Sequence, residues 1–131
     1  MKRMELQSWQ PLAQLAKIRE RVSQVSQTAG WRPAADWFET NEDLVLVMDA
    51  PGLNMNGLEI AHDGARLVVS GEREDQRYGE SRTSERPKGA FQRELEIPTT
   101  VEPGSAVAQY RAGQLEIRFR KLVNTITVHG G

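Results

Sequence analysis

The stretch that decides the fold runs from Ala108 to Lys121 and reads AQYRAGQLEIRFRK. Its second half alternates the apolar residues Leu115, Ile117 and Phe119 with charged residues. A period of two puts the apolar side chains on one face of a β-strand and the charged ones on the other. Gly113 lies just before this strand and suits a tight turn. The stretch therefore predicts a β-hairpin with its turn at Gly113.

The sequence before this hairpin also has the residue patterns of β-strands. Alternating or apolar runs occur at residues 43–50, 58–72 and 91–97, with a Pro51-Gly52 break and an Asp63-Gly64 turn between them. Such short strands, separated by turn residues every eight to twelve positions and by no helical run, are typical of an all-β antiparallel sandwich. With 131 residues the chain has room for one such core and one appended arm.

Residues 1–34 form that arm. Apolar residues recur there at spacings of three and four, Pro11 suits a first helical turn, and Gly30 suits a stop, so we expect an amphipathic helix over about 11–28. The residues on its apolar stripe are Leu12, Leu15, Ile18, Val22 and Val25. The stripe has two interpretations, packing on its own domain or exposure toward partners.

Residues 72–89 are dense in both signs of charge and nearly free of aliphatic side chains. Composition alone favours a solvated loop. Structureless loops longer than about 12–15 residues are nevertheless uncommon inside compact domains, and they tend to be functional.

The composition argues against several classes of partner. With 17 basic and 18 acidic residues the formal net charge is −1, so we expect neither a nucleic acid nor a membrane surface as a partner. The absence of cysteine excludes a disulfide scaffold and a thiolate nucleophile. No apolar run has the length of a signal peptide or a membrane span, so we expect a soluble protein in the cytoplasm.

The motifs of catalysis are also missing. The sequence has no G-x-x-x-x-G-K-[ST] loop, no G-x-S-x-G elbow and no H-x-x-x-H pair. Glu94 and Glu96 share a strand face, but it is the face opposite the apolar one, which favours solvation. We therefore expect no enzyme activity, no catalytic residue, no metal site and no cofactor.

Arg93 breaks the pattern of its strand. Counting by twos puts it on the same face as Phe91, Leu95 and Ile97. A buried unpaired charge costs several kcal/mol, so Arg93 should find a partner, reach water at the sheet edge, or lie at a subunit contact.

Together these segments resemble the alpha-crystallin domain of the small heat-shock proteins, bacterial type. The family signature A-x-x-x-N-G-x-L aligns with Ala108, Gly113 and Leu115, although Ala112 replaces the usual Asn. Further matches are DAPGL at 49–53, LVVSGERE at 67–74 and GAFQRELEIP at 89–98. The resemblance implies an immunoglobulin-like sandwich over residues 35–121, between the arm at 1–34 and a tail at 122–131.

The resemblance also implies a homodimer. In bacterial-type members the long loop carries a strand that crosses to the partner and pairs near the start of its domain, here at about residues 35–39. The interface residues that it implies are Trp37, Phe38, Tyr78, Ser81, Thr83 and Arg93.

A third family element is the C-terminal I-x-I/V motif, matched by Ile126-Thr127-Val128. In the family this motif inserts two aliphatic side chains into an edge groove of a neighbouring subunit. The groove residues here are Leu58, Ile60, Val107 and Ala108. The hinge before the motif is short, and the three residues could equally form a strand end, so a dimer or small oligomers are expected.

The function implied by the resemblance is an ATP-independent holdase chaperone that binds unfolding proteins. We expect its client contacts to come from the arm's apolar stripe, Trp9 and exposed sheet edges. A co-chaperone-type sandwich adaptor that binds one folded partner is the alternative. A carbohydrate-binding sandwich is a remoter one, since it would want an aromatic platform and only eight aromatic residues occur.

Overall fold

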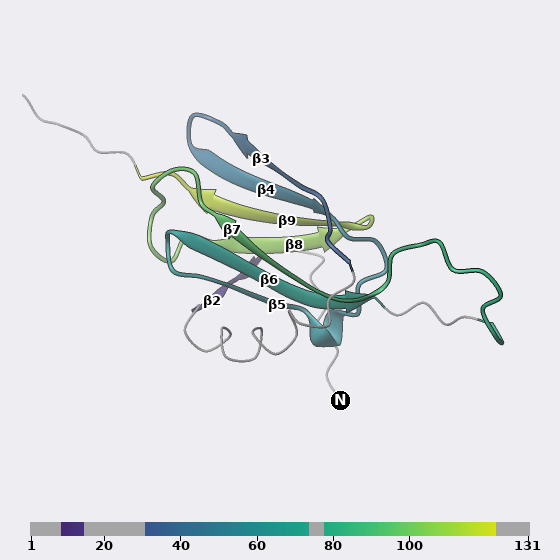
Figure 1. Ribbon diagram of the computed structural model, residues 1–131. Coiled ribbons are helices and arrows are strands. Elements are labelled where there is room, and N and C mark those ends of the chain that lie inside the picture. The colour runs from purple at the N-terminus through teal and green to yellow at the C-terminus, as the bar shows by residue number, and fades with distance from the viewer. Residues whose placement is uncertain (1–8, 15–30, 74–77, 123–131) are drawn as a thin grey trace, which may run out of the picture.

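A computed structural model describes residues 9–14, 31–73 and 78–122, and these residues form a sandwich of two β-sheets (Figure 1). One sheet has five strands in the order β1-β8-β9-β4-β3, and the other has four in the order β2-β5-β6-β7. The strands are β1 (Gln10–Pro11), β2 (Ala13–Gln14), β3 (Ala35–Glu39), β4 (Asp43–Asp49), β5 (Glu59–His62), β6 (Arg66–Arg73), β7 (Gly89–Glu96), β8 (Val107–Arg111) and β9 (Gln114–Arg120). A 3-10 turn, η1 (Met55–Gly57), precedes β5.

The core lies between the inward faces of the two sheets. Its side chains come from alternate positions of the strands, as the period of two predicts. The five-stranded sheet contributes Leu44, Leu46, Met48, Ala108, Leu115, Ile117 and Phe119, and the four-stranded sheet contributes Ile60, Leu67, Val69 and Phe91. The all-β sandwich expected from the sequence is confirmed.

The decisive hairpin has the predicted turn. Arg111 pairs with Gln114, so Ala112 and Gly113 alone make the connection between β8 and β9. Both have positive φ, 51° at Ala112 and 76° at Gly113. Two consecutive left-handed residues are the geometry of a type I′ turn, which matches the twist of an antiparallel pair.

The arm differs from the expectation at its start. The helix predicted from residue 11 does not begin there, because residues 10–14 form the two short strands β1 and β2. Pro11 has no N–H to donate, which suits an edge strand as well as it suits a first helical turn. The remainder of the expected helix, residues 15–28, lies outside the described residues. Within the described ranges no helix is long and apolar enough to cross a membrane.

Residues 31–34 run along another side of the sandwich before β3 begins. Pro33 is fully buried, and the ring of Trp31 meets that of Phe91 edge-on at 5.1 Å between centroids. The guanidinium of Arg73 lies 5.8 Å from the centroid of the Trp31 ring. This stretch therefore anchors the chain just before the first long strand.

Candidate functional site

Strand β3 forms one edge of the five-stranded sheet. Its neighbour in the described structure is β4, with Trp37 opposite Leu46 and Phe38 opposite Val45. The indole of Trp37 turns inward and lies 6.1 Å from the ring of Phe119. Phe38 turns outward and stays 54% exposed. Among the described residues no strand pairs with the other side of β3, so this side is an open backbone edge with an aromatic side chain beside it.

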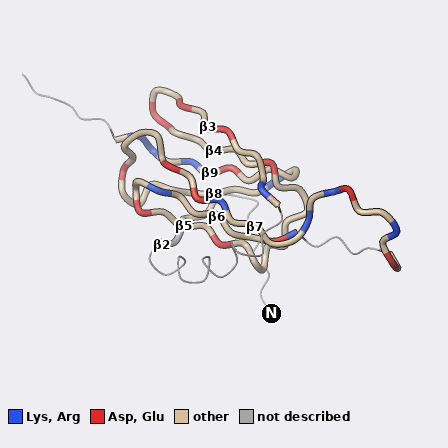
Figure 2. Tube along the Cα trace, viewed as in Figure 1, with Lys and Arg blue, Asp and Glu red and all other residues tan. Residues whose placement is uncertain are grey.

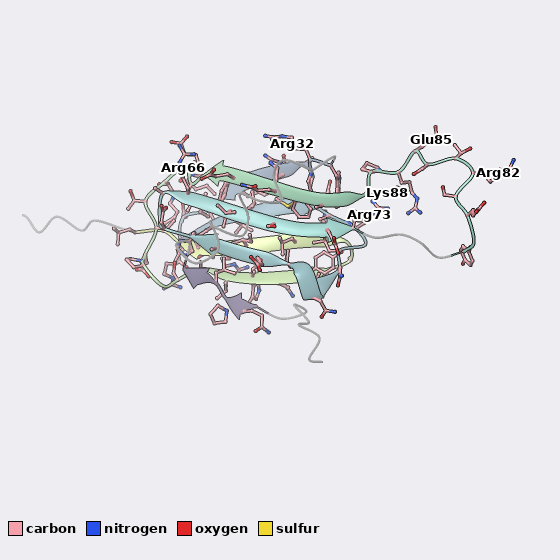
Figure 3. All side chains as sticks on the ribbon, turned by 60° about the horizontal axis from the view of Figure 1, so that its bottom comes forward. Arg32, Arg66, Arg73, Arg82, Glu85 and Lys88 are labelled. Atoms are coloured by element: carbon pink, nitrogen blue, oxygen red, sulfur yellow. The ribbon has the colours of Figure 1, made fainter. Side chains whose placement is uncertain are left out.

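Residues 78–88, which we call the projecting segment, reach away from the sandwich (Figure 1). Residues 78–88 are all exposed, this described part contains no strand, and Tyr78 is 85% exposed. Ser81 donates a hydrogen bond from its hydroxyl to the carbonyl of Thr83 at 3.3 Å. Figure 2 shows basic and acidic residues interspersed along the segment. In Figure 3, Arg82 lies at the far end of the segment and Lys88 lies where it returns to the sandwich.

Arg93 lies on the core face of its strand, as predicted, since it pairs with the buried Val69. Its Nη1 donates to the carbonyl oxygen of Pro33, just before β3. Its buried Nε has no hydrogen-bond partner among the described residues. Burial lowers the pKa of Arg93, and the neighbouring charge of Arg32 lowers that pKa further. Two cations therefore gather at the side of the sandwich where β3 begins.

The opposite edges of the two sheets are β8 and β5, and residues 9–14 lie across them. Strand β1 pairs antiparallel with β8, with Pro11 opposite Val107, and β2 pairs in parallel with β5, with Ala13 opposite Ala61. Between them the N–H of Leu12 donates to the carbonyl of Ala106 at 3.2 Å. We call these two edges, with the side chains between them, the edge site.

The residues expected to form a groove line this edge site. Leu58, Ile60 and Ala108 are buried, and Val107 is half-buried. Leu12 packs against the same core from the arm side. The place expected to hold a tail is therefore covered by the chain's own N-terminal residues.

The remaining predicted contact residues are only partly described. Trp9 is half-buried, and the guanidinium of Arg118 lies 4.7 Å from its ring centroid. The other arm residues, Leu15, Ile18, Val22 and Val25, and the tail residues Ile126 and Val128 lie outside the described residues. Leu122, where the tail begins, is 42% exposed and donates its N–H to the carbonyl of Thr100 at 3.0 Å.

Sequence reasoning missed the pairing of residues 10–14 with the two sheet edges. Leu12 is the first of several apolar residues with helical spacing, and this spacing predicted a helix where the structure has short strands. The signal that could have indicated the pairing is Pro11 beside a single inward-facing aliphatic residue, which suits a short edge strand.

Comparison with known proteins gives one consistent result. The model of the Hsp20/alpha crystallin family matches residues 36–129. The 23.2 kDa heat shock protein of Oryza sativa is 34% identical over 95 residues, which are 66% of this chain and 44% of that protein. The 22.7 kDa class IV heat shock protein of Pisum sativum is 35% identical over 91 residues, 66% of this chain and 46% of that protein. The chain thus spans less than half the length of these plant relatives.

Solved structures agree with this result. The hspA structure from Xanthomonas axonopodis superposes with a TM-score of 0.60 at 31% identity, covering 71% of this chain and 96% of that one. A small heat-shock protein from Xylella fastidiosa gives 0.67 at 26% identity, covering 79% of this chain and 97% of that one.

Proposed function

This chain belongs to the Hsp20/alpha crystallin family, whose members are chaperones and not enzymes, and from this premise we propose that it is an ATP-independent holdase. It acts in the cytoplasm and binds unfolding proteins before they aggregate. Its clients contact apolar side chains of the arm and of the sheet edges.

The observation that carries the proposal is where the exposed large apolar side chains lie. Among the described residues they are Phe38, Tyr78 and Leu122. They fall on the edge strand β3, on the projecting segment and at the start of the tail, which are the parts expected to contact other chains. Each of these three side chains stands alone and forms no patch, and the support comes from its place on a segment that a second chain can pair with or cover.

The working unit that we propose is a homodimer. The segment around residues 78–86 crosses to the partner and adds a strand to the free edge of β3. An edge strand binds an extended segment through backbone hydrogen bonds, and side chains such as Phe38 and Tyr78 then cover each other. Support comes from the edge of β3, which has no second neighbouring strand in the described part of the chain, and from the complete exposure of residues 78–88.

Arg93 and Arg32 add electrostatics to the same contact. Their side of the sandwich is cationic, and the buried Nε of Arg93 keeps an unused donor among the described residues. The projecting segment carries Glu80 and Glu85 as well as basic residues. A carboxylate of the partner's segment placed beside Arg93 forms a charge-assisted hydrogen bond, which sets the register of the dimer.

A holdase has to bind many different client sequences, and high affinity for any one of them matters less. Covering about 300 Å2 of apolar client surface contributes roughly 7 kcal/mol gross at about 25 cal/mol per Å2, from which the ordering of both chains is subtracted. The net binding free energy that remains suits reversible binding of many client sequences.

The test is aggregation of two unrelated heat-sensitive enzymes, followed by light scattering without ATP. A holdase suppresses scattering of both clients at a similar mass ratio. Suppression of one client alone, or of neither, contradicts the proposal. The adaptor alternative predicts instead a stable complex with one folded partner and no effect on either aggregation curve.

A further inference from the structure

We infer that the outer face of the four-stranded sheet is a docking surface for residues 15–28 of the same chain. This surface, which we call the outer face, is made by the side chains of β5, β6 and β7 that point away from the core. Docking there decides between the two interpretations of the arm's apolar stripe in favour of packing on its own domain. The contact lies within one chain and does not require the chaperone activity proposed above.

Burial on the outer face is the first observation. Ala61 and Val68 are opposite each other in the β5–β6 ladder, and they are 0% and 1% exposed. Ser70, two residues further along β6, is only 6% exposed. Neither Ala61 nor Val68 belongs to the cluster between the two sheets. Their burial therefore comes from the outer side of the sheet.

The other sheet supplies a comparison. Val45 and Val47 point outward from β4, which has neighbouring strands on both sides, and both are only half-buried. Val68 has the same setting on β6, between β5 and β7, but it is fully buried. Every described strand belongs to one of the two sheets, so none of them lies over Val68. A covering segment from elsewhere in the chain accounts for the difference.

A buried polar atom lies on the same face. Gln92 is opposite Ser70, and its side-chain Oε1 is buried without a hydrogen-bond partner among the described residues. Buried acceptors normally have a donor. On a helix over residues 15–28, Arg19 and Arg21 flank the apolar stripe on its two sides, so the covering segment carries donors where it meets the sheet.

The two ends of this segment lie at opposite edges of the four-stranded sheet. Strand β2 runs parallel to β5 and ends opposite His62. Trp31 lies at the other edge, where its ring meets that of Phe91 on β7. The core fills the inner side of this sheet, so the direct path between the two ends runs over the outer face.

The length of a helix matches this path. His62 pairs with Leu67 of β6 and Phe91 pairs with Gly71, so the two ends are about 13 Å apart along the strands. Three strand spacings separate β2 from β7, which adds about 14 Å across the sheet. The diagonal is about 20 Å, and residues 15–28 in helical form span about 21 Å. A helix on one face of a sheet is also a common layer arrangement.

The charges of the two surfaces are complementary. The outward positions of β5, β6 and β7 include four glutamates and one arginine, namely Glu59, Glu72, Glu94, Glu96 and Arg66. Residues 15–28 include three basic side chains and one acidic one, namely Lys17, Arg19, Arg21 and Glu20. Opposite net charges attract the basic flanks of the segment to the acidic rim of the apolar patch. A client that binds the stripe, as proposed above, has to displace it from this face.

Trypsin tests the docking, because residues 15–28 contain cleavage sites after Lys17, Arg19 and Arg21. Cleavage needs an open chain, so its rate follows the fraction of molecules in which the segment has left the outer face. The full chain is digested without clients, and cleavage at these sites is followed by mass spectrometry.

Val68→Glu places a charge at the centre of the docking surface and should raise the cleavage rate at least about tenfold. Val25→Glu, on the apolar stripe, should have the same effect, and it leaves the described strands untouched. Val47→Glu is the matched control, since Val47 is an outward valine of the other sheet, and it should leave the rate unchanged. Circular dichroism and thermal melts establish that each variant is folded; if Val68→Glu is not, Val25→Glu carries the test.

Wild-type protein that is cleaved as fast as Val25→Glu, or equal rates in Val68→Glu and Val47→Glu, would overturn the docking. Mixing Val68→Glu with Val25→Glu tests whether the contact lies within one chain. The mixture should be cleaved as fast as its components. Slower cleavage in the mixture would place the segment on the face of a second copy and overturn the assignment to the same chain. All these rates are measured without clients, so the outcome does not depend on whether the protein is a holdase.

Discussion

At the scale of single residues, the turn between β8 and β9 contains a residue with a strained backbone conformation. Ala112 adopts a φ of 51°, a conformation in which its Cβ is strained, whereas Gly113 adopts 76° without that strain. A Cβ added to Gly113 would also lie 3.2 Å from the Cβ of Pro51. The two positions should therefore respond to substitution in opposite directions.

Gly113→Val should destabilise the protein by about 1–3 kcal/mol or more, because it adds a branched side chain at positive φ and against Pro51. Ala112→Gly, the matched change at the adjacent position, should stabilise it by about 0.5–1 kcal/mol. Chemical denaturation of both variants measures these changes in the free energy of unfolding. Equal midpoints for wild type and Gly113→Val would mean that the turn tolerates side chains.

His62 makes stability depend on pH. Its Nδ1 accepts a hydrogen bond from the N–H of Gly64 at 3.1 Å, and its ring packs edge-on against Phe119. Burial lowers the pKa of His62 from 6.5, and the charge of Asp63 opposes that shift. The unfolded chain therefore takes up a proton first, so this contribution to stability is complete above about pH 6.5 and is lost as the pH falls through the folded pKa.

His62→Asn should flatten that dependence, because an amide oxygen can accept the same hydrogen bond without titrating. Melting temperatures of both proteins between pH 7.5 and pH 5.5 provide the measurement. The carboxylates titrate in both, so the difference isolates His62. Parallel melting curves across this range would show that protonation of His62 is harmless.

At the scale of elements, alternating and apolar runs were enough to predict the long strands. β9 alternates apolar with polar residues, and β4 and β9 bury every second side chain, whereas β6 buries five residues in a row and was predicted from its apolar run. Strands β1 and β2 escaped prediction because two-residue strands have no period of their own. They exist because distant sheet edges supply hydrogen-bond partners, and a single sequence does not reveal which edges will be open.

Arg93, at the candidate site, also shows that a single sequence does not reveal contacts between distant segments. Its place on the core face followed from counting by twos, and the structure bears it out. Its hydrogen bond to the carbonyl of Pro33, 60 residues away in the chain, depended on the packing of residues 31–34, which no local pattern encodes.

The projecting segment should be dispensable for folding but needed for the dimer. Arg73 and Gly89 are paired in the β6–β7 ladder, so deleting residues 75–88 and inserting a short turn leaves the sandwich intact. The variant should be a folded monomer, because the crossing strand is gone. Multi-angle light scattering measures its mass.

Phe38→Ser tests the same contact from the other side and should raise the dimer dissociation constant. A deletion variant that stays dimeric would remove the strand-exchange model.

At the scale of the whole molecule, two features favour small assemblies. Lys121 forms a bridge with Val101, and only four residues, Leu122 to Thr125, separate it from the tail motif, so an extended chain of that length spans about 13–14 Å. The edge site is also covered by residues 9–14. Both features hinder a tail from bridging two dimers.

Replacing Ile126 and Val128 together by Ala should therefore leave the size of the protein almost unchanged, as measured by size-exclusion chromatography with light scattering. If the tails did bridge, each lost aliphatic contact would cost about 1–2 kcal/mol per site, and the assembly would fall to dimers on dilution. A large wild-type assembly that the double substitution reduces to dimers would show the four-residue hinge to be sufficient.

Residues 9–14 also make the two sides of the sandwich unequal. Strand β1 extends the five-stranded sheet beyond β8, and β2 extends the four-stranded sheet beyond β5, so one short segment covers an edge of each sheet. On the opposite side β3 and β7 end the two sheets among the described residues. Sheets that are covered on one side can be lengthened by a second chain in one direction only, which favours pairs of molecules over open-ended stacking of sheets.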